Sequence, residues 1–581
     1  MGPVASHEWQ AKSGASSHQS HLDKVDGAAR RVLPALGFVL YATVLTLLPV
    51  SFLPALHGAD SAFWLLSGDA YLYLGIGESS TAEFFSFDGE KPTNGFHPLW
   101  QFYVWTIAKI SAGNAIVLMN TVAWSSVILC LAGVLLLGSA VHRATGSWLP
   151  AMTVVPGVYY LVVGQGLQNL AVWNHFSGME DGLVLMLTGL VAFLISGFDP
   201  DDRRPRPWLA LGTVLALLML ARLDEIFVSA SIGLALLFWA PGLIRRRFPM
   251  VVLLGLPSAI ALGCYLTYNW SYAGVLMPIS GAAKGEGALL QNLYVTLVDF
   301  LAPTFDLREA LTDYSGDRTI LMLGTFRVAE LVFPAVLAGF FVAIIRRHFR
   351  AEPWAPFAAG LCIAIIIKAL YDFAFVNYWH QAPWYFSFAS GTISFVTALM
   401  IAPFLARLRT NARQVVWMLV TLLVLVGSIQ ASMTYARNAQ SIEAVDRLAF
   451  WQARKEIETN LLAARPDAKI LEFGDGMLNF AFDMPVRHGF VFAGDADSLS
   501  ALQNKNLLQA SFADGYTLLA SYEYMRWPGA STNSTSDEIR NFLKNSLLED
   551  RIQIELDQFE FRIAYVYEPL KLPFFLFTPH S

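Results

Sequence analysis

Long apolar stretches separated by short polar connections run through most of this chain. A stretch of about 20 apolar residues can cross a bilayer as a helix. By that measure we expect eleven membrane-spanning helices, at residues 33–53, 115–138, 149–166, 182–198, 208–221, 226–242, 249–270, 329–345, 355–376, 388–405 and 414–432. The composition agrees, because 55% of the 581 residues are hydrophobic, only 14% are charged and the mean hydropathy is +0.48. The pattern therefore predicts an α-helical polytopic membrane protein.

Basic residues gather in alternate connections between these stretches. The arginine clusters stand at 30–31, 143, 203–206, 245–247, 346–350 and 407–413. The positive-inside rule places such connections in the cytoplasm. All of them lie on that side only if the amphipathic stretch 97–112 rests at the membrane interface and does not cross by itself. The N-terminus is then cytoplasmic and the chain after about residue 433 is extracytoplasmic, with the protein in the inner (plasma) membrane.

The chain divides into three regions. The polar residues 1–31 are expected to form a disordered cytoplasmic tail. Residues 32–432 are expected to form the membrane domain, with a first outer loop at 54–114 and a long outer loop at 271–328. Residues 433–581 combine helical and alternating patterns, which predict a small extracytoplasmic α/β domain. Its expected elements are helices at 441–464, 497–508 and 536–549 and strands at 469–473, 486–492, 516–524, 552–557 and 560–567.

Several classes of protein are excluded by composition and spacing. The net charge of −6, with no basic run interleaved with aromatic residues, argues against a nucleic-acid partner. All three cysteines fall in hydrophobic stretches, so no disulfide framework is expected. No spacing fits a tight zinc site, a serine or cysteine triad or a P-loop. The sequence itself predicts no metal site and no cofactor.

Asp69 is the first candidate for chemistry. It begins the segment DAYLYLGIG, directly after the first apolar stretch, and Ala70, Tyr73, Leu74 and Gly77 would share one helical face. A carboxylate at a helix N-terminus is kept ionised by the macrodipole, which suits a general base. The same position is also typical of a helix N-cap. The pattern alone leaves both roles open.

Further polar residues stand at the outer ends of the apolar stretches. Asn94 and His97 lie in a turn rich in glycine and proline, where His97 would bind a phosphate, orient a hydroxyl or serve only the structure. Glu180 and Asp181 stand where a loop enters an apolar stretch. These two carboxylates would cap the following helix or face a polar cavity.

Cations near the outer side would compensate a phosphate charge close to hydrocarbon. Arg222 and Asp224 occupy an outer turn, and Lys284 follows another apolar stretch. Lys368 and Asp372 are four residues apart, so they would pair with each other or face a polar path. His380 belongs to the run YWHQAPWYF (378–386), which is read as an aromatic belt or as a surface on which a sugar stacks.

These motifs together resemble a known superfamily. The string DAYLYL, then FSFDGEKPTNGFHPLW, SGMED, ARLDE and the order Asn, Gly, Pro, Ser, Lys between residues 269 and 284 resemble bacterial membrane proteins of the GT-C glycosyltransferase superfamily. That superfamily includes protein O-mannosyltransferases, aminoarabinose transferases of lipid A and mycobacterial arabinofuranosyltransferases. The string TNGFHPLW is the most specific of these motifs.

The resemblance implies a fold, an activity and roles for particular residues. It implies a GT-C-like membrane domain and a transferase that moves a sugar from a polyprenyl-phosphate donor to an extracytoplasmic glycan, lipid or protein acceptor. An acidic residue of the first outer loop, which maps onto Asp69, acts as general base in such enzymes. Arg222, Lys284 and Lys368 become candidates to neutralise the departing lipid phosphate, and a divalent cation is left open.

The chain departs from the superfamily's pattern at three places. Gly68 stands where a second acidic residue is common, Leu223 stands in place of a proline, and Asp181 stands in place of a small hydroxyl residue. A second class of function is a transporter or flippase of a lipid-linked saccharide, with Lys368 and Asp372 along its path. Against transport, the sequence has no inverted repeat.

Overall fold

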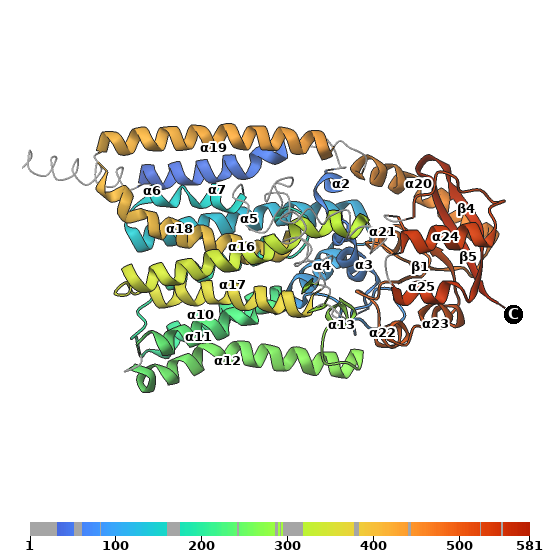
Figure 1. Ribbon diagram of the computed structural model, residues 1–581, viewed down its shortest axis with the longest axis horizontal. Coiled ribbons are helices and arrows are strands. Elements are labelled where there is room, and N and C mark those ends of the chain that lie inside the picture. Colours follow the sequence, from blue (N-terminus) through green and yellow to red (C-terminus); the bar gives the residue numbers. More distant parts are fainter. Residues whose placement is uncertain are drawn as a thin grey trace, which may run out of the picture.

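The computed structural model describes residues 32–51, 61–81, 83–159, 175–240, 243–284, 289–290, 292–293, 318–376, 383–408, 410–439, 443–522, 525–547 and 550–580. Long helices lie side by side along one axis, and a smaller α/β domain sits at one end of this bundle (Figure 1). The short helices of the first outer loop lie between the two parts.

Most of the predicted apolar stretches coincide with helices. The first is the helix Val32–Ser51. The others are α5 (Ala115–Thr145), α9 (Asp181–Ile195), α10 (Pro205–Ala221), α11 (Ile226–Trp239), α12 (Ile244–Tyr268), α16 (Arg318–His348), α17 (Ala355–Phe375), α18 (Ser387–Arg407) and α19 (Thr410–Ala439). The stretch 149–166 differs, because it contains two short helices, α6 (Trp148–Ala151) and α7 (Val154–Tyr159), before it leaves the described residues.

The number of membrane spans stays a prediction. Within the described ranges, five helices are long and apolar enough to cross a membrane: Val32–Ser51, Ala115–Thr145, Ile244–Ala273, Ala355–Phe375 and Ser387–Arg407. Shorter apolar helices include Asp181–Ile195 and Pro205–Ala221. α16 begins at Arg318, inside the stretch 271–328 that was expected to be a loop. The chain is thus a helical multi-pass membrane protein, as its composition predicts.

Small residues allow two central helices of the bundle to approach each other closely. A Cβ atom on Gly189 of α9 would lie 2.6 Å from the carbonyl oxygen of Gly133 on α5. A Cβ atom on Gly133 would in turn lie 2.8 Å from the backbone of Leu185. Because apolar side chains gain little from leaving a lipid environment, close backbone packing of this kind is a main source of stability between membrane helices.

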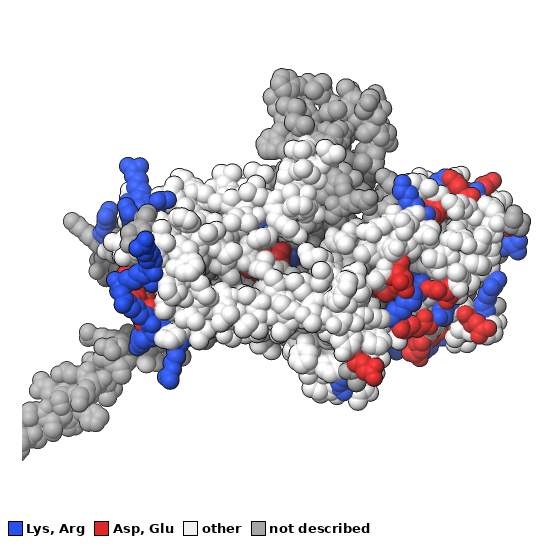
Figure 2. All heavy atoms as spheres, turned by 90° about the horizontal axis from the view of Figure 1, so that it is seen from below, with Lys and Arg blue, Asp and Glu red and all other residues white. Residues whose placement is uncertain are grey.

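Charged side chains are segregated to the two ends of the molecule (Figure 2). A broad, nearly uncharged belt separates the ends, as burial of the belt in hydrocarbon requires. Lysine and arginine side chains predominate at the end opposite the α/β domain, whereas both signs of charge mix over the α/β domain itself.

The C-terminal domain is built around one mixed sheet of order β2-β1-β3-β5-β4. β1 (Lys469–Glu472) pairs in parallel with β2 (Val486–His488) and β3 (Tyr516–Ala520). β5 (Leu572–Pro579) pairs antiparallel with β3 and with β4 (Phe559–Tyr567). The helices around the sheet are α20 (Glu443–Ala464), α21 (Met477–Ala481), α22 (Ala496–Gln503), α23 (Leu507–Ala513), α24 (Ser536–Ser546) and α25 (Asp550–Leu556). The expected α/β domain is confirmed.

One predicted strand is wrong and one strand was missed. Residues 552–556 belong to helix α25, in which Ile552 and Leu556 are buried one turn apart while Ile554 is 51% exposed. A short alternating run fits the repeat of a strand and the repeat of a helix equally well, and contacts across the domain favour the helix here. β5 was missed because prolines stand in it, although Pro573 and Pro579 pair at the two ends of the strand.

Glycines of the first outer loop fix the C-terminal domain against the bundle. The loop contains α2 (Ala62–Leu65), α3 (Ala70–Ser79) and α4 (Pro98–Ile110). A Cβ atom on Gly68 would lie 2.6 Å from Oδ2 of Asp475, and one on Gly75 would lie 2.4 Å from Nδ2 of Asn479. A side chain at either position would force the side chain of Asp475 or Asn479 to shift. Gly68, the departure from the superfamily's pattern, therefore accommodates a carboxylate from the C-terminal domain.

Ion pairs join the same loop to the outer sheet. Lys91 Nζ lies 2.9 Å from Asp497 Oδ2, and Lys469 Nζ lies 2.5 Å from Glu90 Oε1. The Tyr516 hydroxyl donates to Asp88 at 3.3 Å. Since these contacts lie outside the apolar belt and are partly exposed, each contributes little by itself. Together they hold one orientation of the domain over the loop.

Candidate functional site

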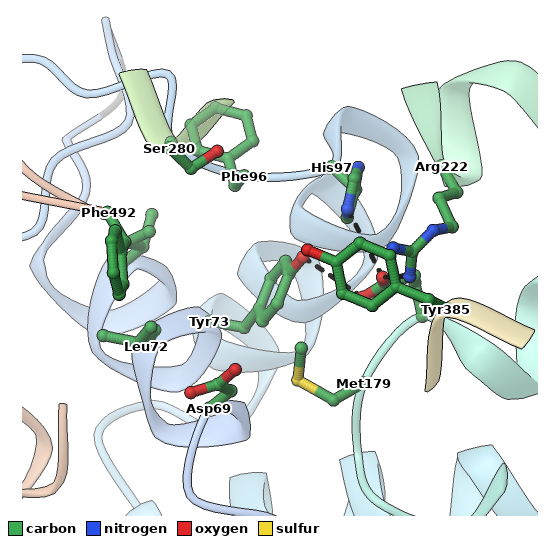
Figure 3. A pocket seen from close by; sticks show the side chains of 13 residues that line it. Asp69, Leu72, Tyr73, Phe96, His97, Met179, Arg222, Ser280, Tyr385 and Phe492 are labelled. Atoms are coloured by element: carbon green, nitrogen blue, oxygen red, sulfur yellow. Dashed lines mark hydrogen bonds and ion pairs between the residues drawn. The ribbon is translucent and has the colours of Figure 1, made fainter. Parts of the chain in front are cut away.

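A pocket of about 540 Å³ lies where the first outer loop, the ends of the bundle helices and the C-terminal domain meet. Its polar lining residues are Asp69, Tyr73, His97, Glu180, Arg222, Ser280 and Tyr385 (Figure 3). Its apolar lining residues are Leu72, Ile76, Gly95, Phe96, Met179 and Phe492. Four residues singled out in the sequence, Asp69, His97, Glu180 and Arg222, are therefore brought together from segments far apart in the chain.

Asp69 stands at the N-cap position of α3 but does not act as a side-chain cap. Its backbone is already helical, with φ −59° and ψ −18°, and its side chain makes no N-cap hydrogen bond to that helix. The carboxylate instead lies at the edge of the pocket (Figure 3). Of the two roles that the sequence leaves open, the N-cap role thus lacks its defining hydrogen bond.

Glu180 is the centre of a buried hydrogen-bond network. Its Oε1 accepts from Arg222 NH1 at 2.7 Å, and its Oε2 accepts from the Tyr73 hydroxyl at 3.2 Å. His97 Nε2 also lies 3.3 Å from Oε1. Although Glu180 occupies the N-cap position of α9, it makes no side-chain cap. It faces the polar pocket, which was the second of the two roles open to it.

The carboxylate of Asp181 is used inside the protein. It accepts hydrogen bonds from Ser177 at 3.1 Å and from Ser387 at 3.0 Å, and its side chain is fully buried. The pocket lining does not include Asp181. Two adjacent carboxylates thus have separate surroundings, one in the pocket and one within the helix packing.

Arg222 ends helix α10, at its C-cap, and is held on three sides. Besides Glu180, its Nε donates to Asp224 at 3.1 Å. Its guanidinium carbon lies 3.9 Å from the ring centroid of Tyr385, which belongs to the turn η6 (Pro383–Phe386). Only 2% of Arg222 is exposed. A guanidinium group that is stacked on a ring and bound to two carboxylates has a fixed orientation. Arg222 therefore orients Glu180 and Asp224.

Lys368 lies behind the pocket and not in its lining. It forms ion pairs with Asp224 and Glu225 of the turn η2 (Leu223–Glu225), the latter at 3.1 Å. These contacts join α17 to that turn. Burial alone would raise the pKa of Asp224, but Arg222 and Lys368 hold this pKa below its ordinary value.

His97 links the first outer loop to the same turn. It stands at the N-cap position of α4, and its Nδ1 accepts from the Leu223 amide at 3.5 Å. With Nδ1 as acceptor, the ring proton of the neutral tautomer resides on Nε2, which faces Glu180. His97 thus combines a structural contact with a place in the pocket lining.

Asn94 and Lys284 connect the loop with the segment that follows α12. The Asn94 amide group donates to Met277 O at 3.2 Å, and its oxygen accepts from the Ile279 amide at 3.0 Å. This double contact holds the short helix α13 (Ile279–Lys284), which brings Ser280 to the pocket. Lys284 ends α13, but its side chain is outside the described residues, as is all of His380.

The residues of this site that were not among the sequence candidates for chemistry include Tyr73, Glu225, Tyr385 and Phe492. Tyr73 could have been found, because it lies one helical turn after Asp69 and shares its face. Glu225 directly follows Asp224 and could have been read with it. Tyr385 stands at the end of the aromatic run that contains His380. Phe492 had no sequence signal, because only the folded C-terminal domain brings it to the pocket.

The described residues contain no group of three or more His, Cys, Asp or Glu side chains arranged to hold a metal ion. The two cations and three carboxylates around the pocket wall bind each other. Arg222 and Lys368 are the cations, and Glu180, Asp224 and Glu225 are the carboxylates. This network supplies fixed charges and hydrogen-bond acceptors in a site that is largely screened from solvent.

Comparison with known proteins yields matches by structure alone. No protein-family model and no curated protein matches the sequence. The structure of ArnT from Cupriavidus metallidurans bound to undecaprenyl phosphate matches with a TM-score of 0.50 and 11% identity, over 95% of this chain and 98% of that one. The Archaeoglobus fulgidus oligosaccharyltransferase in the apo form matches with a TM-score of 0.48 and 13% identity, over 84% of this chain and 69% of that one.

The likeness to ArnT extends over nearly the whole of both chains, including the helical bundle and the outer domain. At this level of identity the likeness concerns the fold. The resemblance found in the sequence motifs is thus accompanied by a fold that this chain shares with ArnT.

Proposed function

We propose that this protein is a membrane glycosyltransferase that moves a sugar from a polyprenyl-phosphate donor to an extracytoplasmic glycan, lipid or protein acceptor. One observation carries the proposal: Asp69, His97, Glu180 and Arg222 line one pocket between the bundle and the outer domain. The GT-C fold and the order of the motifs support the same reaction class. Undecaprenyl phosphate, which the matching ArnT structure contains, has the chemistry expected of the leaving group.

Asp69 is the proposed general base. Its carboxylate would take the proton of the acceptor hydroxyl while the hydroxyl oxygen attacks the anomeric carbon of the donor sugar. The bond from that carbon to the phosphate oxygen breaks, and the polyprenyl phosphate leaves with the electron pair. A single displacement of this kind inverts the anomeric configuration. The absence of a side-chain cap at Asp69 supports this role.

Glu180 and Arg222 are proposed to position the reactants. Arg222 NH1 donates to Glu180 at the pocket wall and fixes the direction in which this carboxylate accepts hydrogen bonds. Since two carboxylates already balance the charge of Arg222, Lys284 is the better candidate to neutralise the leaving phosphate. Its support is its place at the end of α13, the helix that carries Ser280 to the pocket.

The proposed orientation follows from charge. The end of the bundle rich in lysine and arginine would be cytoplasmic by the positive-inside rule (Figure 2). The pocket and the C-terminal domain would then lie on the outer face of the inner membrane.

The test is a mass-spectrometric profile of envelope glycans and polyprenyl-phosphate sugars. Cells would carry wild type, a deletion, Asp69→Asn, or Glu83→Gln as a matched carboxylate-to-amide control in the same loop. We expect Asp69→Asn to match the deletion, with one glycan lost and its lipid-linked donor accumulated, and Glu83→Gln to match wild type. If Asp69→Asn matches wild type while the deletion does not, Asp69 is no base, and transport of a lipid-linked saccharide becomes the better explanation.

A further inference from the structure

The C-terminal domain contributes a side chain to the pocket. Phe492 follows β2, in the turn of residues 489–494, and is half-buried. It lies beside Leu72, on the side of the pocket away from His97, Arg222 and Tyr385 (Figure 3). The pocket therefore has a charged side made by the ends of bundle helices and an apolar side completed by the outer domain.

Backbone contacts hold this turn against the first outer loop. A Cβ atom on Gly95 would lie 1.9 Å from the carbonyl oxygen of Phe492 and 3.1 Å from Cα of Ala493. The Thr93 hydroxyl donates to Gly494 O at 2.6 Å. Because only glycine permits so close an approach, the position of Phe492 is fixed relative to the loop that carries the pocket's polar residues.

The conformation of the turn is also unusual. Val491 has a φ of +63°, in the left-handed region that β-branched residues strongly disfavour. Its side chain is fully buried in the core of the C-terminal domain, which holds the strained backbone in place. Strain retained beside a pocket is typical of segments that position a functional group. Here the next residue along the chain is Phe492.

We propose that Phe492 is a specificity-determining residue that packs against the apolar C–H face of a saccharide ring in the acceptor. This inference rests on the proposed function. The lipid donor would reach the pocket from the bundle, where Arg222 ends α10, whereas Phe492 belongs to the domain farthest from the membrane. The acceptor ring lies between Phe492 and Asp69, with its apolar face on the aromatic ring and its hydroxyl toward the carboxylate.

The test separates the two substrates. Purified full-length protein in nanodiscs is given the lipid-linked sugar fraction and the unmodified envelope glycan fraction, both extracted from deletion cells. Initial rates are measured while each fraction is varied in turn. We expect Phe492→Ala to raise the acceptor KM by about tenfold or more, because burial of an aromatic ring is lost. The donor KM and kcat remain within about twofold of wild type, since no contact to the donor changes.

Two further variants control the experiment. Phe490→Ala removes a ring from the same turn, 5.8 Å from that of Phe492 and outside the pocket lining, and leaves both KM values unchanged. Gly95→Ala keeps Phe492 but displaces the turn, so it raises the acceptor KM as Phe492→Ala does. Size-exclusion profiles that match wild type establish that each variant is folded.

The possible results are distinct. An equal rise in the donor KM, an unchanged acceptor KM in Phe492→Ala, or a rise of the same size in Phe490→Ala overturns the assignment of Phe492. If wild type forms no product from the two fractions, the proposed function itself fails, and the inference fails with it. A rise in the acceptor KM in Phe492→Ala and Gly95→Ala, with wild type still forming product, cannot be confused with that outcome.

Discussion

The ion pair between Arg222 and Glu180 offers a direct test of how the pocket is held together. Arg222 NH1 and Glu180 Oε1 are 2.7 Å apart, and the two side chains are only 2% and 1% exposed. We consider the substitution Arg222→Met, which keeps an unbranched side chain of similar length but removes the charge. Glu180 then remains buried without its closest cation.

The expected loss of stability can be worked from the geometry. At 2.7 Å and an effective dielectric constant of about 20, the attraction between two unit charges is about 6 kcal/mol. Solvation regained on unfolding offsets part of this attraction. Removal of one partner of a buried pair typically costs about 3–5 kcal/mol, because the other charge is left uncompensated. We expect Arg222→Met to fall in that range.

The assay is unfolding of the purified protein by sodium dodecyl sulfate in mixed micelles, followed by circular dichroism. A double-mutant cycle with Glu180→Gln isolates the pair. The doubly substituted protein no longer contains the uncompensated carboxylate, so it should lose about 2 kcal/mol less than the sum of the two single losses. Arg204→Met is the matched control, because Arg204 is exposed and pairs with Asp202 at the surface. We expect no measurable loss there.

Additive losses in the cycle would refute this reasoning, because they would mean that Arg222 does not compensate Glu180. A loss in Arg204→Met as large as that in Arg222→Met would also contradict it. In that case general charge removal, and not the buried pair, would explain the instability.

Three further predictions concern the outer domain and the bundle. Burial, and to a smaller extent the negative charge of Asp475, raises the pKa of Glu472 to about 8. This carboxyl therefore favours its protonated form in the folded state. The protonated carboxyl therefore stabilises the fold fully below about pH 4.5, and this contribution is lost as the pH rises through about 8. The stability of Glu472→Gln should depend less on pH over this interval. An unchanged pH dependence would contradict the raised pKa of Glu472. Gly189→Ala should lower Tm, because the added Cβ atom would lie 2.6 Å from a carbonyl oxygen. Gly263→Ala should leave Tm unchanged, because the Cβ atom added there meets open space. Equal effects of the two substitutions would exclude the packing explanation. Thr535→Ala removes the capping box that Thr535 and Glu538 form at α24 and should cost about 1 kcal/mol in chemical unfolding, a loss that Thr535→Ser largely avoids if the hydroxyl is responsible.

The helical character of the membrane region follows from the sequence because it depends on local properties. An apolar run of sufficient length has no alternative in a bilayer but to satisfy its backbone hydrogen bonds within itself. For this reason the expected helices at 115–138, 355–376 and 388–405 appear as α5, α17 and α18. Their ends shift by several residues, since hydropathy does not specify where a helix leaves the membrane. The amphipathic stretch 97–112 likewise contains a helix, α4, and its place at the membrane interface stays a prediction.

Short amphipathic segments of the C-terminal domain were harder to assign. Residues 552–557 alternate in hydrophobicity over too few positions to separate a strand from a helix, and the helix forms because Ile552, Glu555 and Leu556 are buried on one face. The Glu555 carboxylate accepts hydrogen bonds from the amides of Leu507 and Leu508, at 2.8 and 2.7 Å. No local pattern encodes that contact.

The sequence by itself determined that this chain is a polytopic membrane protein with an outer α/β domain, and it indicated Asp69, His97, Glu180 and Arg222 as residues of interest. Only the tertiary structure decided that these four line one pocket, that Lys368 binds Asp224 and Glu225, and that Phe492 completes the wall. The physical reason is that composition and periodicity act over a few neighbouring residues. Ion pairs and pocket walls, by contrast, depend on how distant segments pack, and here glycines such as Gly68 and Gly95 set that distance.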